Sequence, residues 1–248
     1  MPKYVLLNNV EHKDLRVKLG YSTAYGDNVA STLTFPSEFG DVHKEYPILF
    51  QKNSETGKFQ SIVLLGFKKG ENLFLSSNDK GINPGWNANY VPGIVARGPF
   101  LIGFQDQSSL GGSEQEPVIY VDMESPRVGY EEGERVFREF GGATPYLENI
   151  SDILRGIHAG MEISNAMFAI FEEFGLIEPI AIKIELNNGE KYSVEGNYTI
   201  SEERLRSLDG AALEKLNRSG FLQGAFLVLS SLGNVKRLID IKNASLNV

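Results

Sequence analysis

A long apolar stripe in the second half of the chain sets the strongest limit on how this sequence can fold. Large apolar side chains recur there at steps of three and four residues, with one interruption at Ser164. They are Leu147, Ile150, Leu154, Ile157, Met161, Phe168 and Phe171. This spacing is typical of an amphipathic α-helix. Thr144 and Pro145 predict the start of the helix, as N-cap and first helical residue, and Gly175 predicts its end.

A pattern with a period of two residues follows the predicted helix. Isoleucine and leucine alternate with smaller or charged residues over 180–186, and the alternation resumes at Tyr192 and Val194. Asn188-Gly189 stands between the two runs. This arrangement predicts a β-hairpin with a type I′ turn and one buried face.

Two capping residues and one apolar run complete the second half. Ser201, which two glutamates follow, and Asp209 each predict the start of a helix, because these side chains suit a helix N-terminus. The apolar run from residue 221 to about 241 predicts a last helix. The second half is therefore expected to be helical apart from its hairpin.

The first half is rich in short apolar runs that are typical of β-strands. Residues 59–67 and 72–75 flank Lys68-Lys69-Gly70, which predicts a second hairpin. Two further strands are expected over 100–104 and 118–121. The sequence thus predicts an α+β fold, with a β-rich N-terminal half and a helical C-terminal half that contains a β-hairpin.

The change of character near residue 125 divides the chain into two expected parts. Residues 1–125 form the β-rich part, and residues 126–248 form the part with helix, hairpin and helices. The acidic junction between them still carries Val136, Phe137 and Phe140. Since these side chains can pack, we expect the two parts to form one unit.

Charge and cysteine content exclude several classes of protein. The chain has 24 Lys and Arg against 32 Asp and Glu, a formal net charge of −8, which disfavours binding to nucleic acid. It has no cysteine, which excludes disulfides, thiolate metal sites and a cysteine nucleophile. The first apolar stretch is too short for a secretory signal, and no run is long enough to span a bilayer. We therefore expect a cytoplasmic protein without a transmembrane segment.

The most promising binding residues lie in a stretch rich in Gly, Asn and Pro, over 78–98. It contains Trp86, which is the only tryptophan, together with Tyr90 and Arg97. Aromatic rings supply apolar contact area at low entropic cost, and an arginine fork suits a carboxylate. The sequence predicts a ligand-binding site at these three residues. The alternative is that the two aromatic side chains cover the core where the chain crosses it.

A second cluster consists of acidic residues and one histidine. Glu38, Asp41, His43 and Glu45 crowd one short segment, and these residue types suit a hard-cation site or an acid/base centre. A solvated acidic loop is the alternative. Because no His-x-His or His-Glu-x-x-His pattern occurs, we predict no metal site, no cofactor and no identifiable catalytic residue.

Three residues of the predicted long helix also invite a functional interpretation. His158 is a candidate proton carrier, but a polar-face or satisfied core histidine is the favoured interpretation. Gly156 and Gly160 stand four residues apart, and we expect them to let another element approach the helix closely.

Several short motifs resemble those of the SapC family, in the same order and over most of the chain. They are His12-x-x-Leu15-Arg16, Tyr21, Glu38-Phe39, Glu45–Phe50, Leu64–Phe67, Gly70–Leu75, Trp86-x-x-x-Tyr90-Val91-Pro92, Arg97–Phe100, Leu176–Pro179 and Ser231–Asn234. The family takes its name from a protein linked to export or assembly of a bacterial paracrystalline surface layer. The resemblance therefore implies a bacterial protein with a role near the surface layer or outer membrane, and it implies no activity and no catalytic residue.

Two functions of different classes stay open at this stage. The first is a non-enzymatic binding or assembly factor for a peptide or protein partner in surface-layer or outer-membrane biogenesis. The second is an enzyme that acts on a peptide or small metabolite, with metal assistance through His43 and its neighbours as one version. The sequence also leaves open a homo-oligomer that uses the last apolar helix as its interface.

Overall fold

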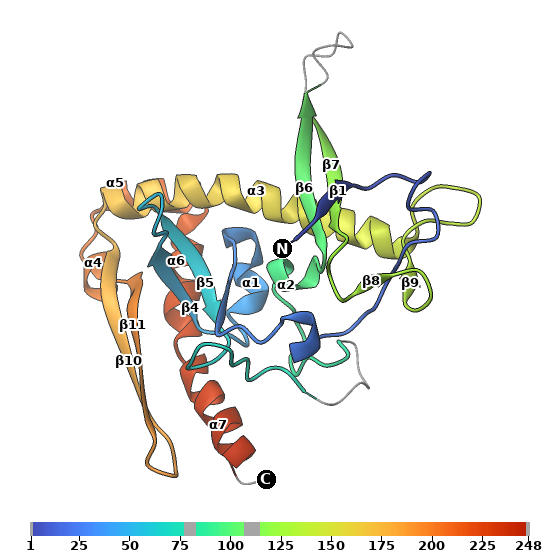
Figure 1. Ribbon diagram of the computed structural model, residues 1–248. Coiled ribbons are helices and arrows are strands. Elements are labelled where there is room, and N and C mark those ends of the chain that lie inside the picture. The colour runs from blue at the N-terminus through green and yellow to red at the C-terminus, as the bar shows by residue number, and fades with distance from the viewer. Residues whose placement is uncertain (1, 77–82, 107–114, 247–248) are drawn as a thin grey trace.

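A computed structural model describes residues 2–76, 83–106 and 115–246 (Figure 1). The helices are α1 Phe39–Val42, α2 Gly93–Ala96, α3 Pro145–Glu173, α4 Glu202–Arg206, α5 Gly210–Arg218, α6 Phe221–Ser231 and α7 Asn234–Leu246, with short 3-10 turns η1 Thr23–Tyr25 and η2 Pro36–Glu38. The strands are β1 Tyr4–Leu6, β2 Arg16–Val17, β3 Ser31–Leu33, β4 Ile48–Lys52, β5 Phe59–Leu64, β6 Phe100–Asp106, β7 Gln115–Asp122, β8 Val128–Gly129, β9 Glu134–Arg135, β10 Ile177–Glu185 and β11 Lys191–Ile200. The predicted α+β fold is confirmed.

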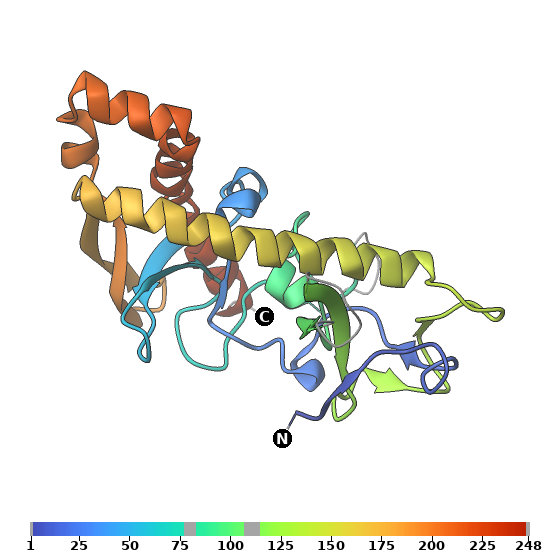
Figure 2. The same cartoon turned by 90° about the horizontal axis from the view of Figure 1, so that it is seen from above.

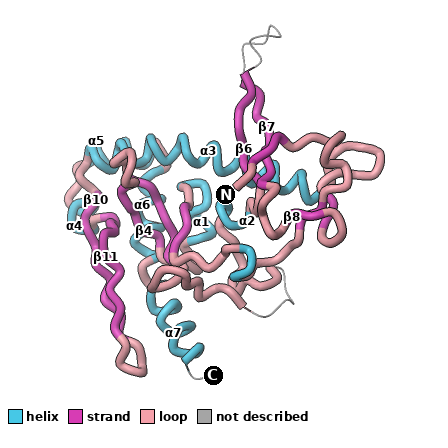
Figure 3. The backbone as a smooth tube through the Cα atoms, viewed as in Figure 1, coloured by secondary structure: helices cyan, strands magenta, loops and turns pink. Residues whose placement is uncertain are grey.

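Three antiparallel sheets organise the chain. The largest has the order β10-β11-β4-β5-β3, and the other two have the orders β1-β7-β6 and β8-β2-β9. Two of these sheets combine strands from either side of residue 125. Within the third sheet, the chain between β8 and β9 is loop (Figure 3).

The long helix α3 begins and ends where the sequence predicts. The Thr144 hydroxyl accepts a hydrogen bond from the Leu147 N–H, Pro145 is the first helical residue, and Gly175 has the left-handed φ of +60° that suits the residue after a helix. Figures 1 and 2 show α3 crossing most of the molecule. No helix of the described ranges is long and apolar enough to cross a membrane.

The apolar stripe of α3 serves two separate cores. Its first half, with Leu147, Ile150 and Leu154, packs in a cluster with the residues around β2, β6 and β7. Its second half, with Met167, Phe168 and Phe171, packs in the cluster that lies on the largest sheet. The helix therefore joins the two cores, and the middle of the helix lies between them.

The predicted hairpin at 180–194 is confirmed, but its predicted turn type is wrong. The Leu186 N–H donates to the Glu190 carbonyl, and the Gly189 N–H donates to the Leu186 carbonyl, which closes a three-residue loop. Gly189 has a φ of +86°, whereas no described non-glycine residue has a positive φ. A type I′ turn needs positive φ at both central residues, so the loop is of the kind with a single left-handed glycine.

Two other expectations fail. Residues 72–75 do not form a strand beside β5, whose partners are β4 and β3. The last helix is not continuous, because the chain breaks between α6 and α7 at Leu232-Gly233. Glycine weakens a helix at this point, and the Asn234 amide donates to the His43 and Tyr46 carbonyls, which fixes the start of α7.

Candidate functional site

Trp86 lies inside the protein rather than on its surface. Only 5% of the residue is exposed, and its ring stacks on Phe74 and meets the edge of Tyr21. Its Nε1 donates to the Tyr46 hydroxyl at 2.8 Å, and that hydroxyl donates to the Tyr90 carbonyl at 2.5 Å. The buried Trp86 side chain therefore anchors its loop to the core. This agrees with the alternative that the sequence left open, in which the aromatic side chain covers the core.

The carboxylate of Glu45 fixes the same loop from the other side. One of its oxygens accepts the backbone N–H groups of Asn89 and Tyr90, at 2.9 and 3.1 Å. The other oxygen pairs with Arg237 of α7 at 3.0 Å. Since Glu45 is buried, this ion pair and the two hydrogen bonds satisfy a charge that would otherwise be costly.

The Tyr90 hydroxyl and the start of α2 both bond to Glu38, the last residue of η2. The hydroxyl donates to Glu38 Oε1 at 2.7 Å, and the Gly93 N–H donates to the same oxygen at 2.7 Å. Burial raises the pKa of Tyr90 well above its ordinary value, and the nearby Glu38 charge adds to the effect. Tyr90 is thus a neutral hydrogen-bond donor across the physiological range.

Tyr90 and Glu38 line a pocket of about 710 Å³, which we call the α2–α3 pocket. One wall is α2 with the loop before it, another is the first half of α3, and the third is the segment 17–21. The α3 wall consists of Tyr146, Asn149, Ile153 and Gly156, with their immediate neighbours on the helix. Residues three and four apart share one helix face, so this wall is a single strip of α3. A volume of this size suits a small ligand or a few side chains of a partner.

Gly156 and Gly160 have different roles on α3. A Cβ at Gly160 would lie 2.6 Å from Phe35 Cβ, so this glycine permits the close approach that the sequence predicts. A Cβ at Gly156 would meet no atom within 4 Å. Gly156 lines the α2–α3 pocket instead, and its lack of a side chain leaves that wall open. The predicted packing role is therefore confirmed for Gly160 and wrong for Gly156.

A buried arginine closes the far side of the α2–α3 pocket. Arg127 is 6% exposed, pairs with Asp27 at 2.6 Å and also donates to the Gly20 carbonyl. Its guanidinium lies 4.4 Å from the centre of the Tyr25 ring. Nothing in the local sequence marks this residue, because its partners are about a hundred positions away. It is a site residue that sequence reasoning missed.

Arg97 does not join Trp86 and Tyr90 in one site. It follows α2 and lines a neighbouring pocket of about 320 Å³, which we call the Arg97 pocket. Val95, Gly98, Pro99 and Arg127 line both pockets, so they form a wall between them. Of the three predicted binding residues, Trp86 is thus buried beneath the loop, Tyr90 lines the α2–α3 pocket and Arg97 lines the Arg97 pocket.

The acidic segment around His43 does not converge on one point. Glu38 and Glu45 bond to the 89–93 loop as described, Asp41 pairs with Lys44, and the His43 ring donates to the Phe39 carbonyl. Within residues 2–76, 83–106 and 115–246, no three His, Asp or Glu side chains gather closely enough to hold a metal ion.

The other two histidines have ordinary structural surroundings. His12 is buried, and its ring accepts the Asn8 N–H at 3.2 Å. His158 of α3 lies with its ring 4.6 Å from that of Phe104 in β6.

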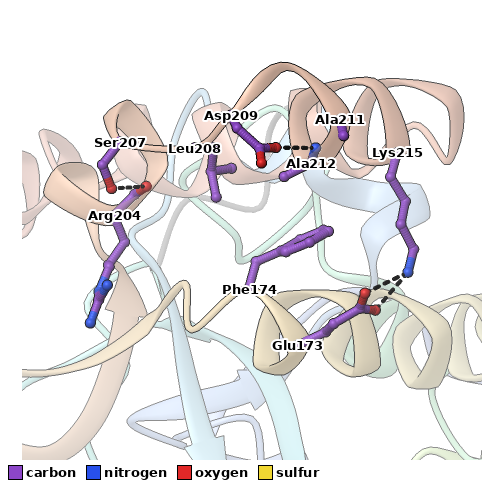
Figure 4. A pocket seen from close by; sticks show the side chains of 9 residues that line it. All are labelled: Glu173, Phe174, Arg204, Ser207, Leu208, Asp209, Ala211, Ala212 and Lys215. Carbon is purple, nitrogen blue, oxygen red and sulfur yellow. Dashed lines mark hydrogen bonds and ion pairs between the residues drawn. The ribbon is translucent and has the colours of Figure 1, made fainter.

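A further pocket, of about 500 Å³, lies where the end of α3 meets α4 and α5. Figure 4 shows Phe174 between these elements, with Lys215 and Glu173 beside it. Lys215 Nζ contacts both carboxylate oxygens of Glu173 at 2.7 Å, and Asp209 accepts the Ala212 N–H that starts α5. These polar groups therefore already have hydrogen-bond or ion-pair partners within the protein. The larger α2–α3 pocket, which combines apolar side chains with a few polar groups, is therefore the stronger candidate.

The fold and the site define an α+β protein with a pocket held between a long helix and a braced loop. A family model described as SapC matches residues 7–238 of the 248-residue chain, so the protein belongs to the SapC family. Neither a curated protein nor a solved structure matches the chain. The family and the geometry of the pocket therefore carry the functional argument.

Proposed function

We propose that this SapC-family protein is a non-enzymatic binding or assembly factor that receives a segment of a peptide or protein partner in the α2–α3 pocket. The single observation that carries this proposal is the pocket itself, of about 710 Å³, with Tyr90 and Glu38 on one wall and an open strip of α3 on another. The setting in surface-layer or outer-membrane biogenesis rests on the family resemblance.

Several features support a preformed binding site. The loop that carries Tyr90 is held by the Glu45 carboxylate and by the Tyr46 hydroxyl, so little order has to be gained on binding. Apolar side chains such as Val91, Val95 and Ile153 line the walls, and Glu38, Asn149 and Asp152 supply polar groups. This mixture of apolar surface and a few polar groups is typical of ligand pockets.

The test fills the pocket from its open wall. In Gly156→Leu, the new side chain points into the pocket while the helix loses a poor helix former, so the fold is kept. Ala169→Leu is the matched control, since Ala169 is an exposed residue of the same helix, about 20 Å further along it. Affinity capture from the native cells would use the wild type and both variants, followed by mass spectrometry of proteins and small molecules.

We expect the wild type and Ala169→Leu to recover the same partner and Gly156→Leu to lose it. Calorimetry with the identified partner should then show at least a tenfold weaker affinity for Gly156→Leu. Equal recovery by Gly156→Leu, with its fold verified by circular dichroism, would show that the α2–α3 pocket is not the binding site.

A further inference from the structure

Arg97 is a partly buried cation that lacks a carboxylate partner. Its Nη1 donates to the Phe100 carbonyl at 2.5 Å. Its Nε is buried without a hydrogen-bond partner, and no ion pair of Arg97 exists within residues 2–76, 83–106 and 115–246. Burial lowers the pKa of Arg97, which shows that its surroundings disfavour the charge. Such a group is costly to the fold unless something else compensates it.

Arg127, which lines the Arg97 pocket as well, has partners that compensate its buried charge. It has the Asp27 carboxylate at 2.6 Å, the Gly20 carbonyl and the face of the Tyr25 ring. The two arginines therefore differ in whether they keep N–H groups available for a ligand. Arg127 is saturated by the protein, whereas the Nε and Nη2 edge of Arg97 is free of partners among the described residues.

Two carboxylates line the Arg97 pocket, and neither pairs with Arg97. Asp27 is paired with Arg127. Asp122 lines the Arg97 pocket, but its Oδ1 accepts the backbone N–H groups of Lys3 and Glu124, at 2.7 and 3.1 Å. The pocket measures about 320 Å³ and is also lined by the paired Asp27 and Arg127, by Tyr4 and Tyr25, and by smaller residues. It has room for a small acid or for the end of a peptide.

We propose that the Arg97 pocket binds a carboxylate group, which pairs with the guanidinium edge that Phe100 does not occupy. The planar edge of an arginine presents two N–H groups at the spacing of two carboxylate oxygens. Nη2 makes the first contact, and a small turn of the side chain brings the buried Nε to the second oxygen. The carboxylate belongs either to a small organic acid or to the C-terminus of a peptide. This site is distinct from the α2–α3 pocket and does not depend on the function proposed there.

The test follows the arginine Nε–H signals of the ¹⁵N-labelled protein by NMR at constant ionic strength. The probes are N-acetylglycine and trialanine, each compared with its C-terminal amide. The Arg97 signal is assigned from its loss in Arg97→Lys, and Arg97→Gln removes the charge as well. Arg206→Gln is the matched control, because Arg206 is exposed and already paired with Glu202.

We expect both free acids to move the Arg97 signal saturably and both amides to leave it in place. Measured by calorimetry, the affinity for both acids should fall at least tenfold in Arg97→Gln and remain unchanged in Arg206→Gln. Tighter binding of trialanine would identify a peptide end, and tighter binding of N-acetylglycine a small acid. If neither acid gives a saturable shift in the wild type, or if Arg97→Gln binds as the wild type does, the proposal is wrong. The wild-type titration decides the question even if a variant fails to fold.

Discussion

Trp86 and Tyr90 lie four residues apart, yet the fold gives their side chains different roles. The Trp86 ring is buried against Phe74 and Tyr21, while the Tyr90 hydroxyl reaches Glu38 on the wall of the α2–α3 pocket. The sequence marks both residues equally, because it shows only that large aromatics stand in a loop rich in Gly, Asn and Pro. Which of them turns inward depends on Tyr46, whose position the local pattern does not encode.

The hydrogen bond between Trp86 and Tyr46 should contribute measurably to stability. Trp86→Phe and Tyr46→Phe each leave one buried polar group without this partner, so each should lower the free energy of unfolding by about 1–3 kcal/mol. The double variant should lose less than the sum of the two, because the hydrogen bond between Trp86 and Tyr46 cannot be lost twice. The Tyr90 carbonyl loses its Tyr46 donor in both Tyr46→Phe and the double variant, so this loss does not affect the comparison. Urea denaturation of the four proteins measures this. Additive losses would contradict the coupling.

The two glycines of α3 should respond in opposite directions to the same small change. Gly160→Ala forces a Cβ to within 2.6 Å of Phe35 Cβ and should cost about 1–3 kcal/mol. Gly156→Ala meets open space and should stabilise the helix by up to about 1 kcal/mol. Thermal unfolding of the pair compares them directly. A stabilised Gly160→Ala would mean that α3 and Phe35 are further apart than described.

At the scale of single elements, local patterns predict the long helix and the hairpin closely. The caps of α3 at Thr144 and of α5 at Asp209 make the expected hydrogen bonds to Leu147 and Ala212. The strands of the β10–β11 hairpin also follow the alternation in the sequence. These features are predictable because each depends on neighbours within a few residues. The turn type is not predictable in this way, because Asn-Gly is compatible with more than one type of loop.

The loop between β10 and β11 offers a direct test of its geometry. Gly189→Ala should destabilise the protein by roughly 1 kcal/mol, because its φ of +86° is unfavourable for alanine. Asn188→Ala should have a smaller effect, since Asn188 does not have a positive φ and loses only an exposed hydrogen bond from the Glu190 N–H. Chemical denaturation of both variants distinguishes the three-residue loop from a type I′ turn. Equal losses would favour the type I′ turn that the sequence predicts.

At the scale of the whole molecule, the sequence does not reveal which distant elements meet. β11 pairs with β4 through Tyr198 and Phe50, and β2 pairs with β8 and β9. These pairings bring the two halves of the chain into common sheets, and α3 then crosses both cores. The α2–α3 pocket exists only because of this assembly, which is why residues such as Arg127 and Gly156 could not be predicted as parts of it.

We propose that the parts 1–125 and 126–248 unfold together, because two sheets combine strands from both. The fluorescence of Trp86 reports on the first part, and far-ultraviolet circular dichroism reports mainly on α3 in the second. The two urea transitions should coincide. Two separate midpoints would show that the parts are independent domains.

The central claim is that a partner occupies the α2–α3 pocket, and site-specific crosslinking tests it most directly. Because the chain has no cysteine, Asn149→Cys and Ala169→Cys each create one thiol that can carry a photoreactive benzophenone. Asn149 is an exposed residue that lines the α2–α3 pocket, so its label can reach a bound partner without filling the pocket as a side chain at position 156 would. After irradiation in native cell lysate, we predict one discrete crosslinked product from the label at position 149 and none from the label at 169. Identical products from both positions, or none from position 149, would contradict the account.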